Sequence, residues 1–174
     1  MTKRQLSVSG FGADVPILPP ILCFALLVVA FTFHYVKPRK LLPKTMTGTK
    51  SVMLRMSIFA GVVASGYYFM TAGVEALDEA GSGVNFTEVN GLVTDTFPYN
   101  HTRNPLYVVI VYFVFPSFSI LFDSKWFLFL MPIMFFYIDL VVIPSEEKLL
   151  SGLYPDDYAE YRENVPRWFT LTSR

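Results

Sequence analysis

Apolar residues gather in four long runs that are separated by polar segments. The runs cover residues 16–36, 52–74, 106–122 and 126–143. A helix needs about 20 apolar residues to cross a bilayer, within a range of about 17–25. Inside hydrocarbon every backbone N–H and C=O must be bonded within the protein, so runs of this kind form helices. The pattern therefore predicts an all-α integral membrane protein with about four transmembrane helices.

Only three residues, 123–125, separate the third run from the fourth. Such a short connection predicts a tight antiparallel helical hairpin. In the second run Gly61 and Ser65 stand four residues apart. Small residues at this spacing let transmembrane helices approach closely, so this face is a candidate helix contact; the alternative is that small residues are simply frequent in membrane helices.

The segment 145–174 after the fourth run predicts an amphipathic helical tail. Ser145 is a candidate N-cap for a first helix, with Glu146 and Glu147 in its first turn. A second helix is predicted to begin at Pro155. Together with the four runs, this predicts a single membrane domain covering residues 1–174.

Composition agrees with a membrane location and excludes several other classes of protein. Of the 174 residues 53% are hydrophobic and only 16% are charged, whereas a soluble domain carries about 25% charged residues. Fourteen Lys/Arg balance fourteen Asp/Glu, so no basic field predicts a nucleic-acid partner. The single cysteine, Cys23, excludes an intramolecular disulfide. His34 and His101 are isolated, so no metal site is expected. Each predicted membrane face carries seven Lys/Arg, so this count favours neither orientation.

The predicted hairpin brings two distant polar segments together. Residues just before the third helix and just after the fourth must emerge on one face. Arg103 and Tyr107 stand before the hairpin, and Glu146 and Glu147 stand after it. Arginine forks a carboxylate and glutamate accepts from an ammonium, so this cluster can hold a zwitterionic ligand. Asp139, seven residues before Glu146, is predicted on the same helix face as a further candidate functional acid.

Three ordered motifs around this hairpin resemble those of the integral-membrane methyltransferases that include isoprenylcysteine carboxyl methyltransferases and phospholipid methyltransferases. That family carries G-P-Y-x-x-x-R-H-P-x-Y before a helical hairpin, E-E-x-x-L after it, and then F-G-x-x-Y-x-x-Y and V-P-R. In the third motif this chain has Leu153-Tyr154 in place of F-G. The matching residues are Pro98, Tyr99, Arg103, Pro105 and Tyr107, then Glu146, Glu147 and Leu150, then Tyr158, Tyr161, Val165, Pro166 and Arg167. The resemblance implies a methyltransferase-like cofactor-binding region over residues 92–169.

Two residues depart from the first motif. Phe97 stands where the family has glycine, and Asn104 stands where it has histidine. The Asn-Pro-x-Tyr order resembles the version in phospholipid N-methyltransferases. A glycine permits close backbone approach to a ligand, so Phe97 leaves open an inactive, methyltransferase-like structural subunit of a larger membrane complex.

The resemblance implies S-adenosylmethionine as cofactor. Arg103 and Glu146 are the catalytic candidates that it implies. The residues it implies for cofactor binding are Tyr99, Arg103, Asn104, Pro105, Tyr107, Glu146 and Glu147. A sulfonium already activates its methyl group, so the protein mainly has to align donor and acceptor and exclude water.

By this resemblance the protein is a S-adenosylmethionine-dependent membrane methyltransferase that acts on a lipid-like acceptor. The first candidate acceptor is the carboxylate of a prenylated cysteine, which the V-P-R motif favours; the alternative is a phospholipid amine, which Asn104 favours. A sterol-reductase-like NADPH enzyme is a further alternative, disfavoured by Arg167 where that group has tyrosine. The expected partners are the bilayer and a lipid or prenylated substrate. The expected location is the endoplasmic reticulum or another organelle membrane.

Overall fold

The computed structural model describes residues 15–43, 48–81 and 92–169. It contains four helices that are long and apolar enough to cross a membrane: Pro19–Val36, Thr49–Glu79, Pro105–Phe122 and Trp126–Leu153. The first two are α1 and α2. The third span joins α3 (Pro105–Val109), a π-helical turn η1 (Ile110–Val114) and α4 (Phe115–Phe122). The fourth span joins α5 (Trp126–Tyr137), a π-helical turn η2 (Ile138–Val142) and α6 (Ile143–Leu153), and α7 (Pro155–Asn164) follows it. The predicted all-α membrane fold is confirmed.

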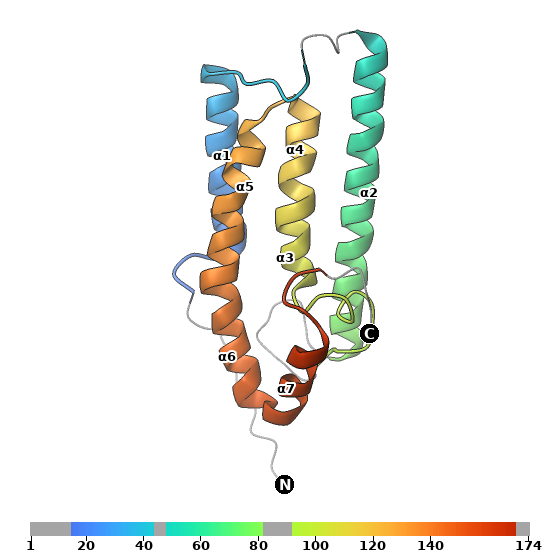
Figure 1. Ribbon diagram of the computed structural model, residues 1–174, viewed down its shortest axis with the longest axis vertical. Coiled ribbons are helices and arrows are strands. Elements are labelled where there is room, and N and C mark those ends of the chain that lie inside the picture. Colours follow the sequence, from blue (N-terminus) through green and yellow to red (C-terminus); the bar gives the residue numbers. More distant parts are fainter. Residues whose placement is uncertain (1–14, 44–47, 82–91, 170–174) are drawn as a thin grey trace.

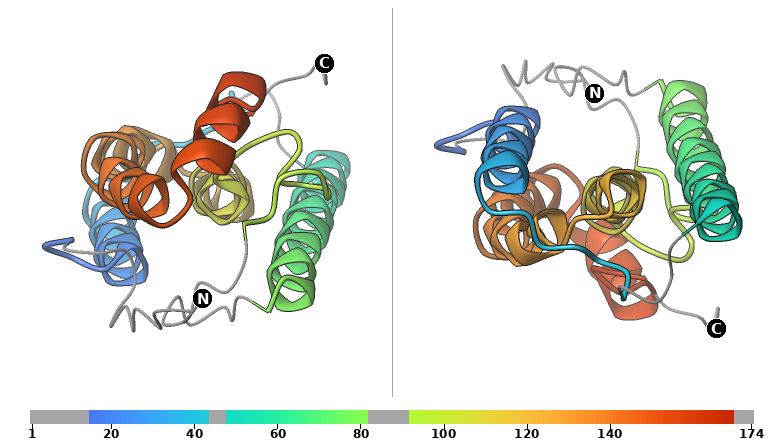
Figure 2. Two further views of the ribbon diagram at one scale, coloured as in Figure 1. Left: turned by 90° about the horizontal axis from the view of Figure 1, so that it is seen from below. Right: turned by 90° about the horizontal axis from the view of Figure 1, so that it is seen from above.

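The four spans stand side by side, with the third and fourth spans between α1 and α2 (Figures 1 and 2). The two flanking helices expose much apolar surface: Phe24 on α1 is 70% exposed and Leu54 on α2 is 53% exposed. Hydrocarbon removes the cost that such side chains would carry in water, so these faces are the lipid-facing surface.

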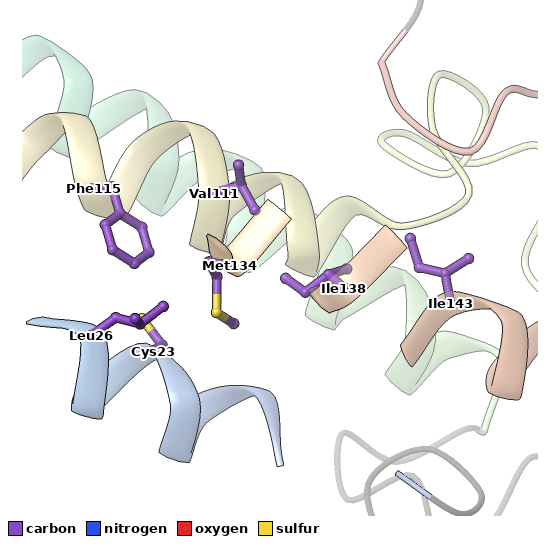
Figure 3. Close-up of a cluster of buried hydrophobic side chains, with 7 residues drawn as sticks. All are labelled: Cys23, Leu26, Val111, Phe115, Met134, Ile138 and Ile143. Carbon is purple, nitrogen blue, oxygen red and sulfur yellow. The ribbon is translucent and has the colours of Figure 1, made fainter. Parts of the chain in front are cut away.

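A buried apolar cluster joins α1 to the two central spans (Figure 3). Its members are Cys23, Leu26, Val111, Phe115, Met134, Ile138 and Ile143. A second cluster packs Phe69 of α2 against Val108 and Val109 of the third span. The third span therefore contributes residues to both clusters.

The hairpin between α4 and α5 is as tight as the sequence predicts. Asp123 ends α4 in the left-handed conformation at φ 50°. The Ser124 N–H donates to the Ser119 carbonyl at 3.0 Å and the Asp123 N–H donates to Ile120, the pattern of a Schellman cap. The Ser119 hydroxyl donates to the Ser124 carbonyl at 2.7 Å. Two orphan carbonyls at the end of α4 are thereby satisfied without water.

Both π-helical turns end two residues before a proline. These prolines are Pro116 after η1 and Pro144 after η2. A proline lacks an N–H, and its ring clashes with the carbonyl four residues earlier in an α-helix. A π turn, with one residue more than an α-helical turn, accommodates that ring and lets the helix continue. Each turn also rotates the residues beyond it relative to a regular helix.

The predicted cap at Ser145 is wrong. Ser145 lies inside α6, and the fourth span runs without a break from Trp126 to Leu153. Since η2 accommodates Pro144, that proline does not end the helix. The second predicted tail helix is confirmed, because α7 begins at Pro155.

The predicted helix contact at Gly61 and Ser65 is also wrong among the described residues. Both are exposed, and a Cβ built on Gly61 meets nothing within 4 Å. The contact lies further along the same helix, where a Cβ on Gly66 would stand 2.9 Å from the Phe113 Cβ. A Cβ on Gly73 would stand 3.6 Å from Pro98 and Leu106, which is ordinary van der Waals contact. Small residues do line the interface, but on the face that starts at Gly66.

Gly66→Ala is expected to lower the melting temperature in detergent, whereas Gly61→Ala is expected to leave it unchanged. The new methyl group must push α2 away from Phe113, and such overpacking costs about 1–3 kcal/mol. Thermal unfolding of the two purified variants tests this. Equal melting temperatures would show that α2 does not pack on the third span through Gly66.

Candidate functional site

Glu147 is the centre of a buried ionic cluster at the end of the bundle where α6 and α7 lie. Its side chain is 11% exposed, and Arg103 Nη1 lies 2.9 Å from Oε1. Arg167 donates from Nε to Oε1 at 3.2 Å and from Nη2 to Oε2 at 2.8 Å. One carboxylate therefore holds two guanidinium groups, one of them in a bidentate fork.

Arg103 comes from the segment between α2 and α3 and is held at three points. Its backbone N–H donates to the Pro166 carbonyl at 3.0 Å, and Nη1 donates to the Tyr158 hydroxyl at 3.2 Å as well as pairing with Glu147. Its Nε is buried and has no partner among the described residues. The side chain is thus fixed in position while one strong donor stays available.

Tyr107 and Glu146 form a second pair beside this cluster. The Tyr107 hydroxyl, on the first turn of the third span, donates to Glu146 Oε1. Glu146 and Glu147 are consecutive in α6, so their side chains point about 100° apart. The two glutamates consequently have different partners: Glu146 faces the third span, and Glu147 faces the tail.

Asp139 joins the cluster through Arg167. Its Oδ1 accepts from Arg167 Nη1 at 3.2 Å and from Trp168 Nε1 at 2.8 Å. The residues from Asp139 to Glu147 include η2, whose extra residue makes eight positions equal about two turns. Asp139 therefore shares Arg167 with Glu147, and not with Glu146 as regular helix spacing predicts.

Asn104 and Thr102 hold the tail in place through its backbone. The Thr102 hydroxyl and the Asn104 side-chain amide donate to the Arg167 carbonyl at 3.0 and 2.9 Å. Pro105 is fully buried and begins α3, where the missing N–H costs nothing. These residues position Arg167 as much as they line the site.

Tyr99 is 8% exposed and lies against α7. Its carbonyl accepts from the Tyr161 hydroxyl at 2.7 Å. Burial raises the pKa of both the Tyr99 and the Tyr161 phenol above the usual value. Both phenols therefore stay neutral at every physiological pH.

Phe97, the residue that departs from the motif, turns toward α2. Its ring packs edge-on against Phe69 with centroids 5.4 Å apart and stacks on Tyr68 at 5.8 Å. His101 closes the same aromatic group at 5.8 Å. None of these contacts involves the Arg103–Glu147 or Tyr107–Glu146 pair.

Two hollows lie on the described part of the protein, and none of the residues of the ionic cluster lines either of them. One, of about 400 Å³, is a polar hollow between the segment before α3 and α7, with Asp95, Asp157 and Glu160 on its wall. The other, of about 350 Å³, is apolar and lies between α2 and the third span, with Gly66, Met70 and Phe113 on its wall. Within residues 15–43, 48–81 and 92–169 no group of three His, Cys, Asp or Glu side chains could hold a metal ion.

The sequence model of the phospholipid methyltransferase family matches residues 54–157, about three fifths of the chain. The chain belongs to this family. The match extends from the early part of α2 to the start of α7, and so includes Arg103, Tyr107, Glu146 and Glu147. The resemblance stated from the three motifs is thereby confirmed. No curated protein and no solved structure matches the chain significantly.

Membership supports a membrane methyltransferase that acts on a lipid-like molecule and uses a methyl donor of the S-adenosylmethionine type. Within this family member, two residues outside the predicted site belong to the cluster: Arg167 and Tyr158. Both belong to the motifs after the hairpin. A contact with Glu147 or Arg103 could be expected only once the tail was known to fold back across the hairpin ends.

Glu147→Gln is expected to destabilise the protein by about 3 kcal/mol, because it leaves the buried Arg103 guanidinium without a carboxylate and removes one of the two carboxylates of the half-buried Arg167. Glu163→Gln on the exposed side of α7 removes the same charge and is the matched control. Thermal unfolding in detergent compares the two. If both variants unfold at one temperature, Glu147 does not hold the tail to the bundle.

Proposed function

We propose that this protein transfers a methyl group from S-adenosylmethionine to the amine of a phospholipid headgroup. The buried cluster of Arg103, Glu147, Tyr107 and Glu146 supports this most directly. It supplies a cation and a carboxylate side by side at one end of a membrane bundle. It also belongs to a chain whose family is that of phospholipid methyltransferases.

The residues of the cluster fit the amino-acid part of the cofactor. The unpartnered, buried Nε of Arg103 is a strong donor that a ligand carboxylate would satisfy, and leaving such a group unpaired costs about 1–3 kcal/mol or more. Both Glu147 oxygens are bonded to arginines, so Glu147 positions Arg103. Tyr107 occupies one oxygen of Glu146, and the other is the proposed contact with the amine that is methylated.

The remaining predicted residues take supporting roles in this proposal. The amide nitrogen of Asn104 is bound to the tail, so its oxygen is the atom left to face a ligand. Tyr99 offers a neutral phenol, and Pro105 fixes the start of α3 so that Tyr107 points at Glu146. The 92–169 region would then form the cofactor-binding part of a single membrane domain.

The proposed reaction requires the protein to position methyl donor and acceptor and to supply one proton acceptor. S-adenosylmethionine, when bound, supplies a methyl group already activated by the sulfonium. An ammonium headgroup must first lose a proton, so that the nitrogen lone pair can form the new C–N bond. Glu146, or the Tyr107–Glu146 pair, is the proposed acceptor of that proton. The apolar spans beside the site exclude water during the transfer.

The charge of this end of the molecule favours an amine over a carboxylate acceptor. Arg103, Lys148, Arg162 and Arg167 are its described basic residues. Its described acidic residues are Glu75, Asp78, Glu79, Asp95, Asp139, Glu146, Glu147, Asp156, Asp157, Glu160 and Glu163. The excess of carboxylates attracts an ammonium headgroup and repels the carboxylate of a prenylated cysteine.

Purified protein in proteoliposomes is expected to methylate phosphatidylethanolamine and to leave a prenylcysteine analogue unmodified.

Arg103→Lys should weaken S-adenosylhomocysteine binding about ten- to hundredfold, because lysine cannot reproduce the fork of arginine and a charge-assisted bond is worth about 1.5–3 kcal/mol. Calorimetry measures the binding, and Arg162→Lys on the exposed side of α7 is the control. Methylation of the prenylcysteine analogue alone would overturn the amine assignment; an unchanged affinity of Arg103→Lys would remove Arg103 from the ligand site.

Comparing the native protein with Phe97→Gly distinguishes an active enzyme from an inactive structural subunit. Because the Phe97 ring packs on Phe69 and Tyr68, we expect the native protein to bind S-adenosylhomocysteine, and the variant to unfold at a lower temperature without binding more tightly. Calorimetry and thermal unfolding measure both. Binding by the glycine variant alone would mean that Phe97 blocks the site, and the protein would then be an inactive member.

A further inference from the structure

The end of the bundle away from the site is basic. Its described basic residues are Lys37, Arg39, Lys40, Lys50, Arg55 and Lys125. Asp123 is the only acidic residue at this end in the part of the chain that the structure describes. We call these six basic residues the basic end. The molecule thus separates its charges along the membrane normal, although its total charge is zero.

The carboxylate of Asp123 already has two partners within the protein. Its Oδ2 lies 3.5 Å from Arg55 Nη1, and its Oδ1 accepts from the Leu42 N–H at 2.8 Å. Of the other members, Lys37, Lys40, Lys50 and Lys125 are exposed, and none of them pairs with a carboxylate among the described residues. Their charges have no counter-ion within that part of the protein.

The segment 37–43 carries three of the six basic residues, and its backbone is bound to the hairpin. The Lys125 N–H donates to the Arg39 carbonyl at 2.8 Å, and the Leu41 N–H donates to the Asp123 carbonyl at 3.2 Å. Trp126 Nε1 donates to the Lys37 carbonyl at 2.7 Å, and the Arg39 guanidinium lies 5.5 Å from the Trp126 ring centre. The backbone that carries the basic side chains is therefore tied to the hairpin.

The depth of these residues follows from the spans that carry them. α1 ends at Val36, α2 begins at Thr49 and α5 begins at Trp126, and these three helix ends lie at the same end of the bundle (Figure 1). Lys37, Arg39, Lys40 and Lys125 therefore lie just outside the spans, and Lys50 and Arg55 lie in the first two turns of α2. Trp126 stacks on Phe33 with centroids 4.7 Å apart, and tryptophan is typical of the headgroup level. The groups at that level are lipid phosphates.

We propose that the basic end binds the headgroups of anionic phospholipids in the leaflet that it faces. A zwitterionic headgroup carries its own ammonium and leaves the charge of the basic end unbalanced, whereas an anionic headgroup neutralises it. Each basic side chain near an anionic membrane surface strengthens attraction about fivefold. This surface lies at the opposite end from the methyltransferase site and does not depend on the proposed reaction.

Native mass spectrometry of the full chain, released from detergent micelles with added lipid, measures this binding directly. We expect phosphatidylglycerol to be retained in preference to phosphatidylcholine. Lys37→Gln with Lys40→Gln should lower phosphatidylglycerol affinity about tenfold or more. The matched control, Lys148→Gln with Arg162→Gln, removes the same two charges at the acidic end and should change it by less than about twofold.

Equal retention of phosphatidylcholine, or an equal loss in the control variant, would overturn the proposal. Inorganic phosphate is added in a separate arm, and competition by phosphate as strong as by the lipid would reduce the basic end to a simple anion site and also overturn it. Melting temperatures without lipid check that the variants fold. If the double variant unfolds, the two single variants must each lower the affinity about fivefold, and unchanged single variants refute the proposal.

Discussion

The carboxylate of Glu147 is the constraint on which the candidate site depends. An ionised carboxylate at this depth must be paired, and its partners come from two segments that are far apart in the sequence. Arg103 brings the connection before the third span, and Arg167 brings the tail after α7. Three parts of the chain are therefore fixed to one another by a single residue of the fourth span.

The bilayer makes this arrangement stronger than it would be in water. Predominantly apolar spans lie on the bundle side of the cluster, so water competes less for the ion pairs than it would at an ordinary protein surface. The tail is also held by neutral bonds, because Thr102 and Asn104 donate to the Arg167 carbonyl and Trp168 donates to Asp139. The stacking of Trp168 on Phe135, with centroids 4.9 Å apart, continues the same contact into the apolar core. The tail around Arg167 and Trp168 is therefore part of the candidate site.

The sequence predicts the four spans, the hairpin and the convergence of Arg103 and Tyr107 with the two glutamates, because apolar length and loop length decide them. It does not predict the details that depend on helix phase. Ser145 followed by two glutamates suggested a helix start, yet the fourth span continues through Ser145. η2 accommodates Pro144 and brings Asp139 into register with Glu147. Gly61 and Gly66 are equally small, and only the position of Phe113 decides which one is in contact. The partners of Arg167 depend on how the tail folds back, which no local pattern encodes.

Helix geometry also gives the two adjacent glutamates separate tasks. Consecutive residues of a helix point about 100° apart, so one carboxylate cannot face both Tyr107 and the tail. Glu147 is fully occupied by two cations and can neither bind a further ammonium nor take up a proton without losing them. Glu146 has a neutral phenol as its partner, and that bond is compatible with either a charged or a protonated carboxyl group. A reaction that removes a proton from an amine is therefore best assigned to Glu146, with Glu147 holding Arg103 in place to orient the donor. The E-E pair is needed as a pair because its members cannot substitute for each other.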